Sequence, residues 1–449
     1  MKFAKYSSYK DSGFNWIGEI PTNWGIKRVG HHIDFITGFA FKSEHFSFDS
    51  GIKLVRGDNV TEGMLRWGDK TRYWPVISND IKQYLLCEKD ILIGMDGSKV
   101  GKNHTLVQRD DLPLLLVQRV ARLRTDEQLN YKYLYHLISS NLFKVWVALV
   151  KTDPAIPHIS PADIKGFPLP FPSIDEQQKI ANFLDHETAN IDTLIDKQEK
   201  LIELLKEKRQ AVISHAVTKG LNPDAPMKYS GVEWLGEVPE HWTVGRVKNL
   251  AKLISKGTTP STIGGDFIDE GIRFLKGENI GKSLFVNPSP TFYISEEVDA
   301  QLSRSRLQEN DVLVIIAGAT TGKASILTKD LLPANTNQAV SFIRPKKAIY
   351  SKLITLWLST EFAQRIIWMG AVQAAQPNLS MENLGNLPIV LPDEDEIASL
   401  LNEIDKKVEQ FDALIIKANS AIELMKERKI ALISAAVTGK IDVRDWELK

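Results

Sequence analysis

The chain has 449 residues, of which 43% are hydrophobic and 25% charged. This length exceeds what one hydrophobic core usually organises, so we expect two or more domains. No apolar run approaches eighteen residues and no secretory leader is recognisable, which argues against a membrane-spanning or secreted protein and favours the cytoplasm. The single cysteine, Cys87, excludes an internal disulfide framework and a cysteine-based zinc cluster, and the net charge of zero does not by itself indicate a nucleic-acid binder.

A motif near the N-terminus is repeated in the middle of the chain. WIGEIPTNW (16–24) is matched by WLGEVPEHW (234–242), 218 residues later. Three further pairs follow at offsets of 220 or 221: LVRGDNV (54–60) with FLKGENI (274–280), DILIGMDGSKVGK (90–102) with DVLVIIAGATTGK (311–323), and VQRVARLR (117–124) with NQAVSFIR (337–344). Offsets held this closely indicate a tandem duplication of a unit of roughly 220 residues.

In each copy, a short apolar strand (90–94 and 311–317) runs into a glycine-rich loop. The loops are reminiscent of a nucleotide-binding P-loop, but Gly97 and Gly101 enclose three residues where that motif needs four, followed by Lys-Ser/Thr. Nucleotide hydrolysis is therefore not expected. Free N–H groups, hydroxyls and a lysine would suit contact with a DNA phosphate, and a plain turn with an exposed lysine remains the alternative.

The rest of each copy is predicted to be helical and then turn-rich. Residues 131–150 and 350–368 have helical periodicity with aromatic residues on the apolar face. The proline-punctuated stretches 166–173 and 386–393 lead into the next element as turn-rich segments.

A long helix closes each copy. From Ile174 to Lys219 no proline or glycine interrupts the chain, and a matching stretch covers 393–441. Apolar residues recur at alternating steps of three and four, or their multiples, which is typical of a coiled-coil seam. The predicted seam consists of Leu184, Ile191, Leu194, Leu201, Leu205 and Val212 in the first helix, and Ile404, Phe411, Leu414, Met425 and Leu432 in the second.

We expect the two helices to pair with each other as an antiparallel coiled coil within the chain, related by an approximate twofold axis. The alternative is that each helix packs on its own domain or on a separate protein. The predicted fold class is α+β, with two mixed α/β domains separated by the two helices. The predicted segments are a first domain (1–173), a central helix (174–222), a second domain (223–392), a distal helix (393–441) and a C-terminal tail (442–449).

Polar and basic side chains outside the helices are the candidates for contact with DNA. Arg, Lys, Asn and Gln pair well with base edges, and in both copies such residues stand beside the glycine-rich turns. The candidates are Arg56, Asn59, Ser98, Lys99, Lys102, Gln118, Arg119, Lys276, Asn279, Thr320, Thr321, Lys323, Asn335, Gln338, Gln376 and Asn378. No hydrolase, metalloprotease, dinucleotide-binding or adenine-methyltransferase motif is present, so neither a catalytic site nor a metal site is predicted.

The chain resembles the specificity subunits of type I restriction–modification systems over essentially its whole length. The helix endings ELLKEKRQAVISHAVTKG and ELMKERKIALISAAVTGKI, the lead-in PLPFPSIDEQQKIANFLD and the paired WIGEIPTNW and WLGEVPEHW openings carry the resemblance. Thr438-Gly439 keeps the terminal Thr-Gly of the family, whereas the first copy has Thr218-Lys219.

The resemblance implies a subunit without an active site that reads a bipartite, asymmetric DNA target, one half with each domain. It implies as partners double-stranded DNA, two modification (methyltransferase) subunits and the restriction subunits. S-adenosylmethionine would then be bound by the modification subunits, and ATP and Mg²⁺ by the restriction subunits, with no cofactor on this chain. The helices would act as spacer and docking surface, for which their net acidic outer face is the first candidate.

Two alternatives remain at this point: the equivalent subunit of a type IIB-like restriction enzyme, and a coiled-coil scaffold that does not bind DNA. The target sequence and its gap are not readable from the residues.

Overall fold

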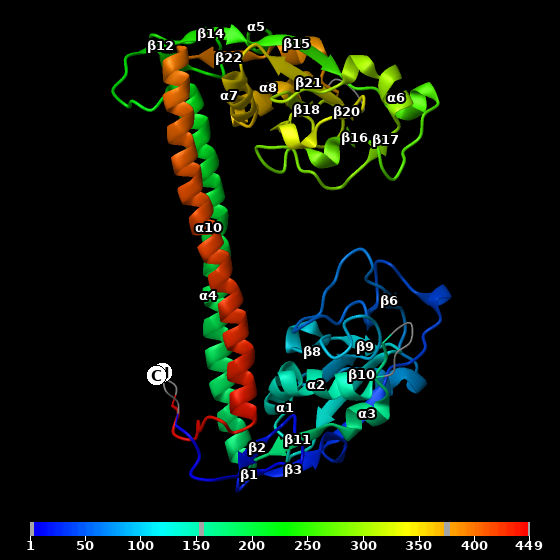
Figure 1. Ribbon diagram of the computed structural model, residues 1–449. Helices are drawn as coiled ribbons and strands as arrows, with labels where there is room; N and C mark the ends of the chain where they lie inside the picture. Colours follow the sequence, from blue (N-terminus) through cyan, green and yellow to red (C-terminus); the bar gives the residue numbers. More distant parts are fainter. Residues whose placement is uncertain (1–3, 152–156, 372–377, 448–449) are drawn as a thin grey trace. The chain divides into compact units, whose positions relative to one another are not determined.

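The computed structural model describes residues 4–151, 157–371 and 378–447 (Figure 1). The chain forms two compact units, and each unit contains one half of each long helix. Unit 1 combines Met1–Glu199 with Asn419–Lys449, and unit 2 is Lys200–Ala418. The α+β class is confirmed, with a mixed domain in each copy and the long helix between the domains in sequence.

The domain of unit 1 is built on two sheets. A four-stranded antiparallel sheet has the order β4-β10-β7-β8, and a three-stranded sheet has the order β6-β5-β9, in which β5 and β9 are parallel. Two pairs, β1-β2 and β3-β11, complete the strands. The elements are β1 Tyr9–Asp11, β2 Glu19–Pro21, β3 Gly25–Arg28, β4 Ile33–Thr37, β5 Ile52–Val55, β6 Tyr73–Trp74, β7 Ile91–Gly94, β8 His104–Leu106, β9 Leu114–Leu116, β10 Val120–Thr125, α1 Tyr131–Ser139, α2 Asn141–Val150, α3 Pro161–Gly166 and β11 Pro168–Phe171.

The domain of unit 2 repeats this architecture strand for strand. Its sheets have the orders β15-β21-β18-β19 and β17-β16-β20, with β16 and β20 parallel, and its pairs are β12-β13 and β14-β22. The elements are β12 Met227–Tyr229, β13 Glu237–Pro239, β14 Thr243–Arg246, α5 Val247–Leu250, β15 Ala251–Lys256, β16 Ile272–Leu275, β17 Tyr293–Ile294, α6 Glu296–Gln301, β18 Val312–Ile315, β19 Ala324–Ile326, β20 Ala334–Thr336, β21 Val340–Pro345, α7 Ala348–Leu358, α8 Glu361–Ala371, α9 Met381–Asn386 and β22 Pro388–Leu391. The predicted duplication is confirmed, because the equivalent segments form equivalent sheets.

The structure confirms some of the local predictions and corrects others. The strands predicted before the glycine-rich loops are present as β7 and β18. The segments predicted to be helical, 131–150 and 350–368, are helical, but each lies over two helices, α1 with α2 and α7 with α8. In the first, the Ser140 side chain accepts from the N–H of Leu142 and caps the second helix. The stretches predicted as turn-rich at 166–173 and 386–393 contain the strands β11 and β22, whose prolines are tolerated at the edge of two-stranded pairs.

The long helices are α4, Ile174–Lys219, and α10, Glu394–Val437. Each is followed by a glycine with a left-handed backbone, Gly220 at φ +78° and Gly439 at φ +70°. A Cβ on Gly439 would lie 2.4 Å from Pro21, and one on Gly220 would lie 3.3 Å from the buried Trp242. The repeated tryptophan–proline motif is therefore the surface on which each helix end is packed.

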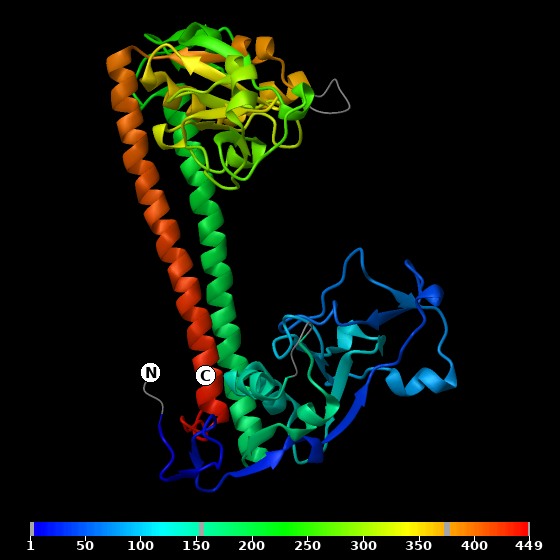
Figure 2. The ribbon, with the colours of Figure 1, turned by 45° about the vertical axis from the view of Figure 1, so that its right-hand side comes forward.

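Within each unit the two helices run antiparallel (Figure 2). In unit 1, the start of α4 packs in one core with the end of α10, while Asp192 further along α4 accepts from Lys429 Nζ at 2.6 Å. In unit 2, the end of α4 packs with the start of α10, and Arg209 pairs with Asp412. The pairing is thus within the chain, as predicted.

The predicted seam is correct in part. Leu184, Ile191 and Ile404 are buried, and Leu205, Val212, Phe411, Met425 and Leu432 are half-buried.

Leu194, Leu201 and Leu414 are wrong as seam residues: their exposed fractions are 49%, 42% and 48%. Each is replaced on the buried stripe by the isoleucine that follows it on the same helix: Ile195, Ile202 and Ile415. Either the leucine or the isoleucine that follows it could continue the spacing of three and four residues, so the sequence is compatible with two seams. In the structure, the seam is the one in which Thr188, Ile202 and Ile422 are buried.

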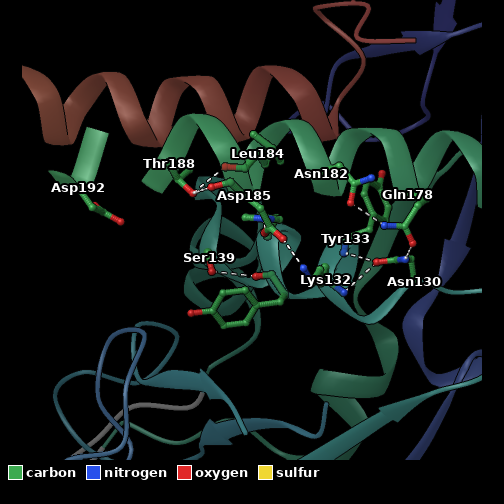
Figure 3. Close-up of polar contacts among 12 residues, drawn as sticks. Asn130, Lys132, Tyr133, Ser139, Gln178, Asn182, Leu184, Asp185, Thr188 and Asp192 are labelled. Carbon is green, nitrogen blue, oxygen red and sulfur yellow. Dashed lines mark hydrogen bonds and ion pairs between the residues drawn. The ribbon is translucent and has the colours of Figure 1, made fainter. Parts of the chain in front are cut away.

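In unit 1, polar contacts join the domain to α4 (Figure 3). On α1, Lys132 Nζ and His136 Nε2 lie 2.6 and 2.8 Å from the two carboxylate oxygens of Asp185. Burial alone would raise the pKa of Asp185, but its hydrogen bonds with His136 and Lys132 outweigh burial and hold that pKa below its usual value. In unit 2, Lys352 and Asp405 form the equivalent pair. These contacts orient each domain on the helix segment of its own unit.

Candidate DNA interface

In unit 1, strand pairing brings three loops to one edge of the domain. β5 and β9 are parallel, so Val55 lies beside Leu116 and the loops after both strands begin at the same edge. β10 starts beside the end of β7, where Val120 pairs with Gly94. Loops 56–61, 95–103 and 117–119 therefore meet, and they line a cleft of about 610 Å³.

Most of the DNA-binding residues predicted for the first copy lie in this cleft. Arg56, Ser98, Lys99, Gln118 and Arg119 all line it, and Lys102 is exposed on the same loop without lining the cleft. Their contact with DNA stays a prediction.

The lining carries more positive than negative charge. The lining contains two carboxylates, those of Asp58 and Asp96, and four cationic side chains, those of Arg56, Arg66, Lys99 and Arg119. A concave, cationic and polar surface of this kind attracts a phosphate backbone and can also contact base edges.

The equivalent edge of unit 2 carries a different set of side chains. Leu275 pairs with Thr336 and Ile315 with Val340, so the loops that hold Lys276, Thr320 and Gln338 start from one edge. Asn378 reaches the same place through a bridge with Ala317. Thr320, Gln338 and Asn378 are exposed.

Two lysines of unit 2 are held differently from the cleft residues. The ammonium of Lys276 lies 3.5 Å from the ring centre of Phe292 and 4.0 Å from that of Phe267, in a cation–π contact with both. Lys323 lines a separate hollow of about 630 Å³ against α4, α7 and α10, so the structure does not gather it with the other candidates.

Four predicted DNA-binding residues are wrong as free polar groups, because they are buried and already hydrogen-bonded: Asn59, Asn279, Asn335 and Thr321.

The two equivalent asparagines shape the loops that carry Arg56 and Lys276. Asn59 Oδ1 accepts from Arg56 N at 3.0 Å, and Asn279 Oδ1 accepts from Lys276 N at the same distance. Asn335 Nδ2 donates to Asp299, and Thr321 Oγ1 donates to the carbonyl of Gly318. The asparagine that is repeated in both copies therefore stabilises its own loop. Gln376 lies outside the described residues.

The prediction missed two charged residues that line the first cleft, Arg66 and Asp96. It also missed His158, which contacts Asp96 from the segment after α2. Asp96 stands inside the glycine-rich loop, so its place beside Lys99 was a usable signal. Nothing in the sequence connects His158 to this loop, because the contact spans 62 residues.

Neither a metal site nor a membrane-spanning helix is found among the described residues. No group of three or more His, Cys, Asp or Glu side chains in that part of the chain could hold a metal ion. Likewise, no helix in the described ranges is long and apolar enough to cross a membrane.

The family model for the type I restriction modification DNA specificity domain matches the chain twice, over residues 21–204 and 239–425. The chain belongs to this family. Its function is that of the specificity subunit of a type I restriction–modification system, with two DNA specificity domains in tandem.

Curated relatives match over nearly the whole chain. The EcoBI specificity subunit of Escherichia coli is 26% identical over 96% of this chain and 89% of its own length. The MjaVIII specificity subunit of Methanocaldococcus jannaschii is 24% identical over 99% of this chain and 98% of its own.

Solved structures share the fold. A chain from a study of complex assembly and conformational transition in a type I restriction–modification system has a TM-score of 0.67 at 15% identity, covering 94% of this chain and 99% of that one. The HsdS subunit of Thermoanaerobacter tengcongensis has a TM-score of 0.50 at 15% identity, covering 94% and 98%.

Proposed function

We propose that this specificity subunit reads a bipartite, asymmetric DNA target, one half with the loop edge of each domain, and that it carries no active site of its own. The cationic three-loop cleft of unit 1 is the observation that supports the proposal. The duplication supplies a second edge with different side chains, which accounts for two unlike half-sites. We expect the complex to work on DNA in the cytoplasm.

The test is to map methylated adenines in DNA from cells that express the chain with its modification subunit. A bipartite motif with a fixed gap is the expected result. Methylation without a motif, or no preference of the purified complex for a motif-bearing duplex over a random one across a salt series, would reject the proposal. Specific sites are typically bound about 10³- to 10⁷-fold tighter than random DNA.

The double variant Lys99→Ala/Lys102→Ala should weaken binding to every duplex and flatten its salt dependence. Each lysine is exposed on the glycine-rich loop and would release about one counterion on contact with a phosphate, so the slope of log K against log salt should fall by up to about 1.8. The measurement is a salt titration of the complex with fluorescent duplexes. Lys206→Ala/Lys208→Ala, which removes two exposed lysines of α4, is the matched control. An unchanged slope would remove the loop from the interface.

We further propose that the exposed leucines of the helix pair dock the modification subunits, in place of the acidic face first considered. In unit 1, Leu194 of α4 and Leu424 of α10 are exposed; in unit 2, Leu204 and Leu414 are. The two sets are equivalent, since Leu194 corresponds to Leu414 and Leu204 to Leu424 at the offset of 220. Duplicated apolar surfaces fit two copies of one partner.

The double variant Leu194→Glu/Leu424→Glu should reduce the number of bound modification subunits from two to one, with at least about tenfold weaker binding at unit 1, because it places charge at an apolar interface. Native mass spectrometry of the reconstituted complex measures this stoichiometry. Thr193→Glu/Ser420→Glu is the control, since both residues are exposed on the same helices of the same unit. Full occupancy in the leucine variant would show that the partner docks elsewhere.

The cofactors of such a system are proposed to belong to its other subunits: S-adenosylmethionine to the modification subunits, and ATP and Mg²⁺ to the restriction subunits. The resemblance to the family supports this assignment.

A further inference from the structure

The turn that carries Arg119 has a backbone conformation that its counterpart in the second copy lacks. Arg119 has a left-handed conformation, with φ +69°, in the turn between β9 and β10, where Val120 N donates to Val117 O at 3.3 Å. A side chain other than glycine rarely adopts this conformation, and it persists where its surroundings enforce it.

Comparison of the two copies shows which positive-φ conformations belong to the shared fold and which occurs in the first domain alone. Three non-glycine residues have positive φ in the described part of the chain: Lys89, Arg119 and Asn310. Lys89 and Asn310 are equivalent at the offset of 221, so their conformation belongs to the shared fold. The counterpart of Arg119 is Ala339, which has no positive φ although Val340 N still donates to Asn337 O. The conformation of Arg119 is thus peculiar to the first domain.

A carboxylate holds the Arg119 side chain from one side. Arg119 Nε lies 3.3 Å from Asp96 Oδ2, and the other oxygen of Asp96 contacts His158 Nδ1. Asp96 is mostly buried, whereas the Arg119 side chain is 69% exposed. The second copy has Ala317 and Asn378 at the positions of Asp96 and His158, so it lacks all three members of this arrangement.

The Arg119 side chain is among those that line the cleft. Arg119 contacts Asp96 through Nε, and among the described residues its terminal nitrogens donate no hydrogen bond. A guanidinium held in this way presents a fixed fork of two donors, which matches the two acceptors O6 and N7 of guanine in the major groove. A phosphate anchor would not require such fixing, because a flexible lysine serves as well.

We infer that Arg119, positioned by Asp96 and His158, reads a guanine in the half-site of the first domain. This inference rests on the proposed function. In it, Arg119 touches the base, and Asp96 is a positioning residue that acts through Arg119. The second domain must read its half-site by other side chains.

The test maps adenine methylation in cells that express the modification subunit with wild-type chain, Arg119→Lys, Arg119→Ala or Asp96→Asn. In the wild type, one base pair of one half-site is expected to require guanine. In Arg119→Lys and Arg119→Ala, the discrimination at that single base pair should fall by about 5- to 150-fold while the other half-site stays unchanged. Asp96→Asn should relax the same base pair, and combining it with Arg119→Ala should add nothing further.

Arg109→Lys is the matched control, because Arg109 is exposed on the same domain and does not line the cleft. If the Arg119 variants methylate the unchanged motif, with or without a uniform loss of efficiency, the inference is overturned and the proposed function stands. If the wild type itself shows no bipartite motif, both are overturned.

Discussion

Deleting residues 195–201 together with residues 415–421 is expected to shorten the gap between the two half-sites while leaving both half-sites unchanged. Each deletion removes one heptad, and the two segments are equivalent at the offset of 220. Seven helical residues span about 10.5 Å, which corresponds to up to about three base pairs at 3.4 Å per pair. The wild-type target should then no longer be methylated.

The phase of the seam is preserved in this variant. Ile191 and Ile202 lie on the buried stripe before and after the first deletion, and Phe411 and Ile422 flank the second in the same way. The helices should therefore still pair. Methylome sequencing reads the new gap directly.

Two further variants sharpen the result. Duplicating both segments should lengthen the gap by a similar amount. Deleting four residues from each helix instead of seven breaks the phase and should abolish assembly, because the apolar stripe is rotated out of the pair. A constant gap in the seven-residue variant would show that the helices do not set the spacing.

Arg344→Ala should destabilise unit 2 by about 3–5 kcal/mol. Arg344 Nε and Nη2 donate to the two oxygens of Asp311 at 2.9 and 2.8 Å, and Asp311 is fully buried. Removing the arginine leaves a buried carboxylate without a counter-charge, with Gln308 N still donating to its Oδ2. Chemical denaturation measures the loss, and hydrogen exchange at β18 and β21 localises it.

The loss should grow with pH. Burial already raises the pKa of Asp311 above its ordinary value although Arg344 opposes the shift, and without Arg344 the pKa rises further. A carboxyl whose pKa is raised on folding stabilises most below its unfolded pKa, about 3.9, and this contribution is lost as pH rises through the folded pKa.

Arg344→Ala/Asp311→Asn should recover part of the stability and flatten the pH dependence, since an amide needs no counter-charge. Arg124→Ala in the equivalent pair with Asp90 is the matched comparison and should cost less, because Arg124 is more exposed than Arg344. A loss in Arg344→Ala that is below about 1 kcal/mol, or that does not change with pH, would contradict this account.

Much about this protein was determined by the sequence alone. Repeats 220 residues apart established the duplication, and an uninterrupted 3–4 periodicity established the long helices, because both signals are one-dimensional and extend over many residues. The family followed from the same segments. The choice of seam did not follow, since Leu194 and Ile195 are equally apolar neighbours and only packing in three dimensions distinguishes them.

The tertiary structure decided which polar residues are free to act. Asn59 and Asn279 resembled base readers because they recur beside glycine-rich turns, yet their side chains hold those turns together. Arg119 was one candidate among sixteen until its backbone conformation and its contact with Asp96 set it apart. The sequence specifies which groups are available, but the hydrogen bonds of the folded loops determine which of them remain exposed.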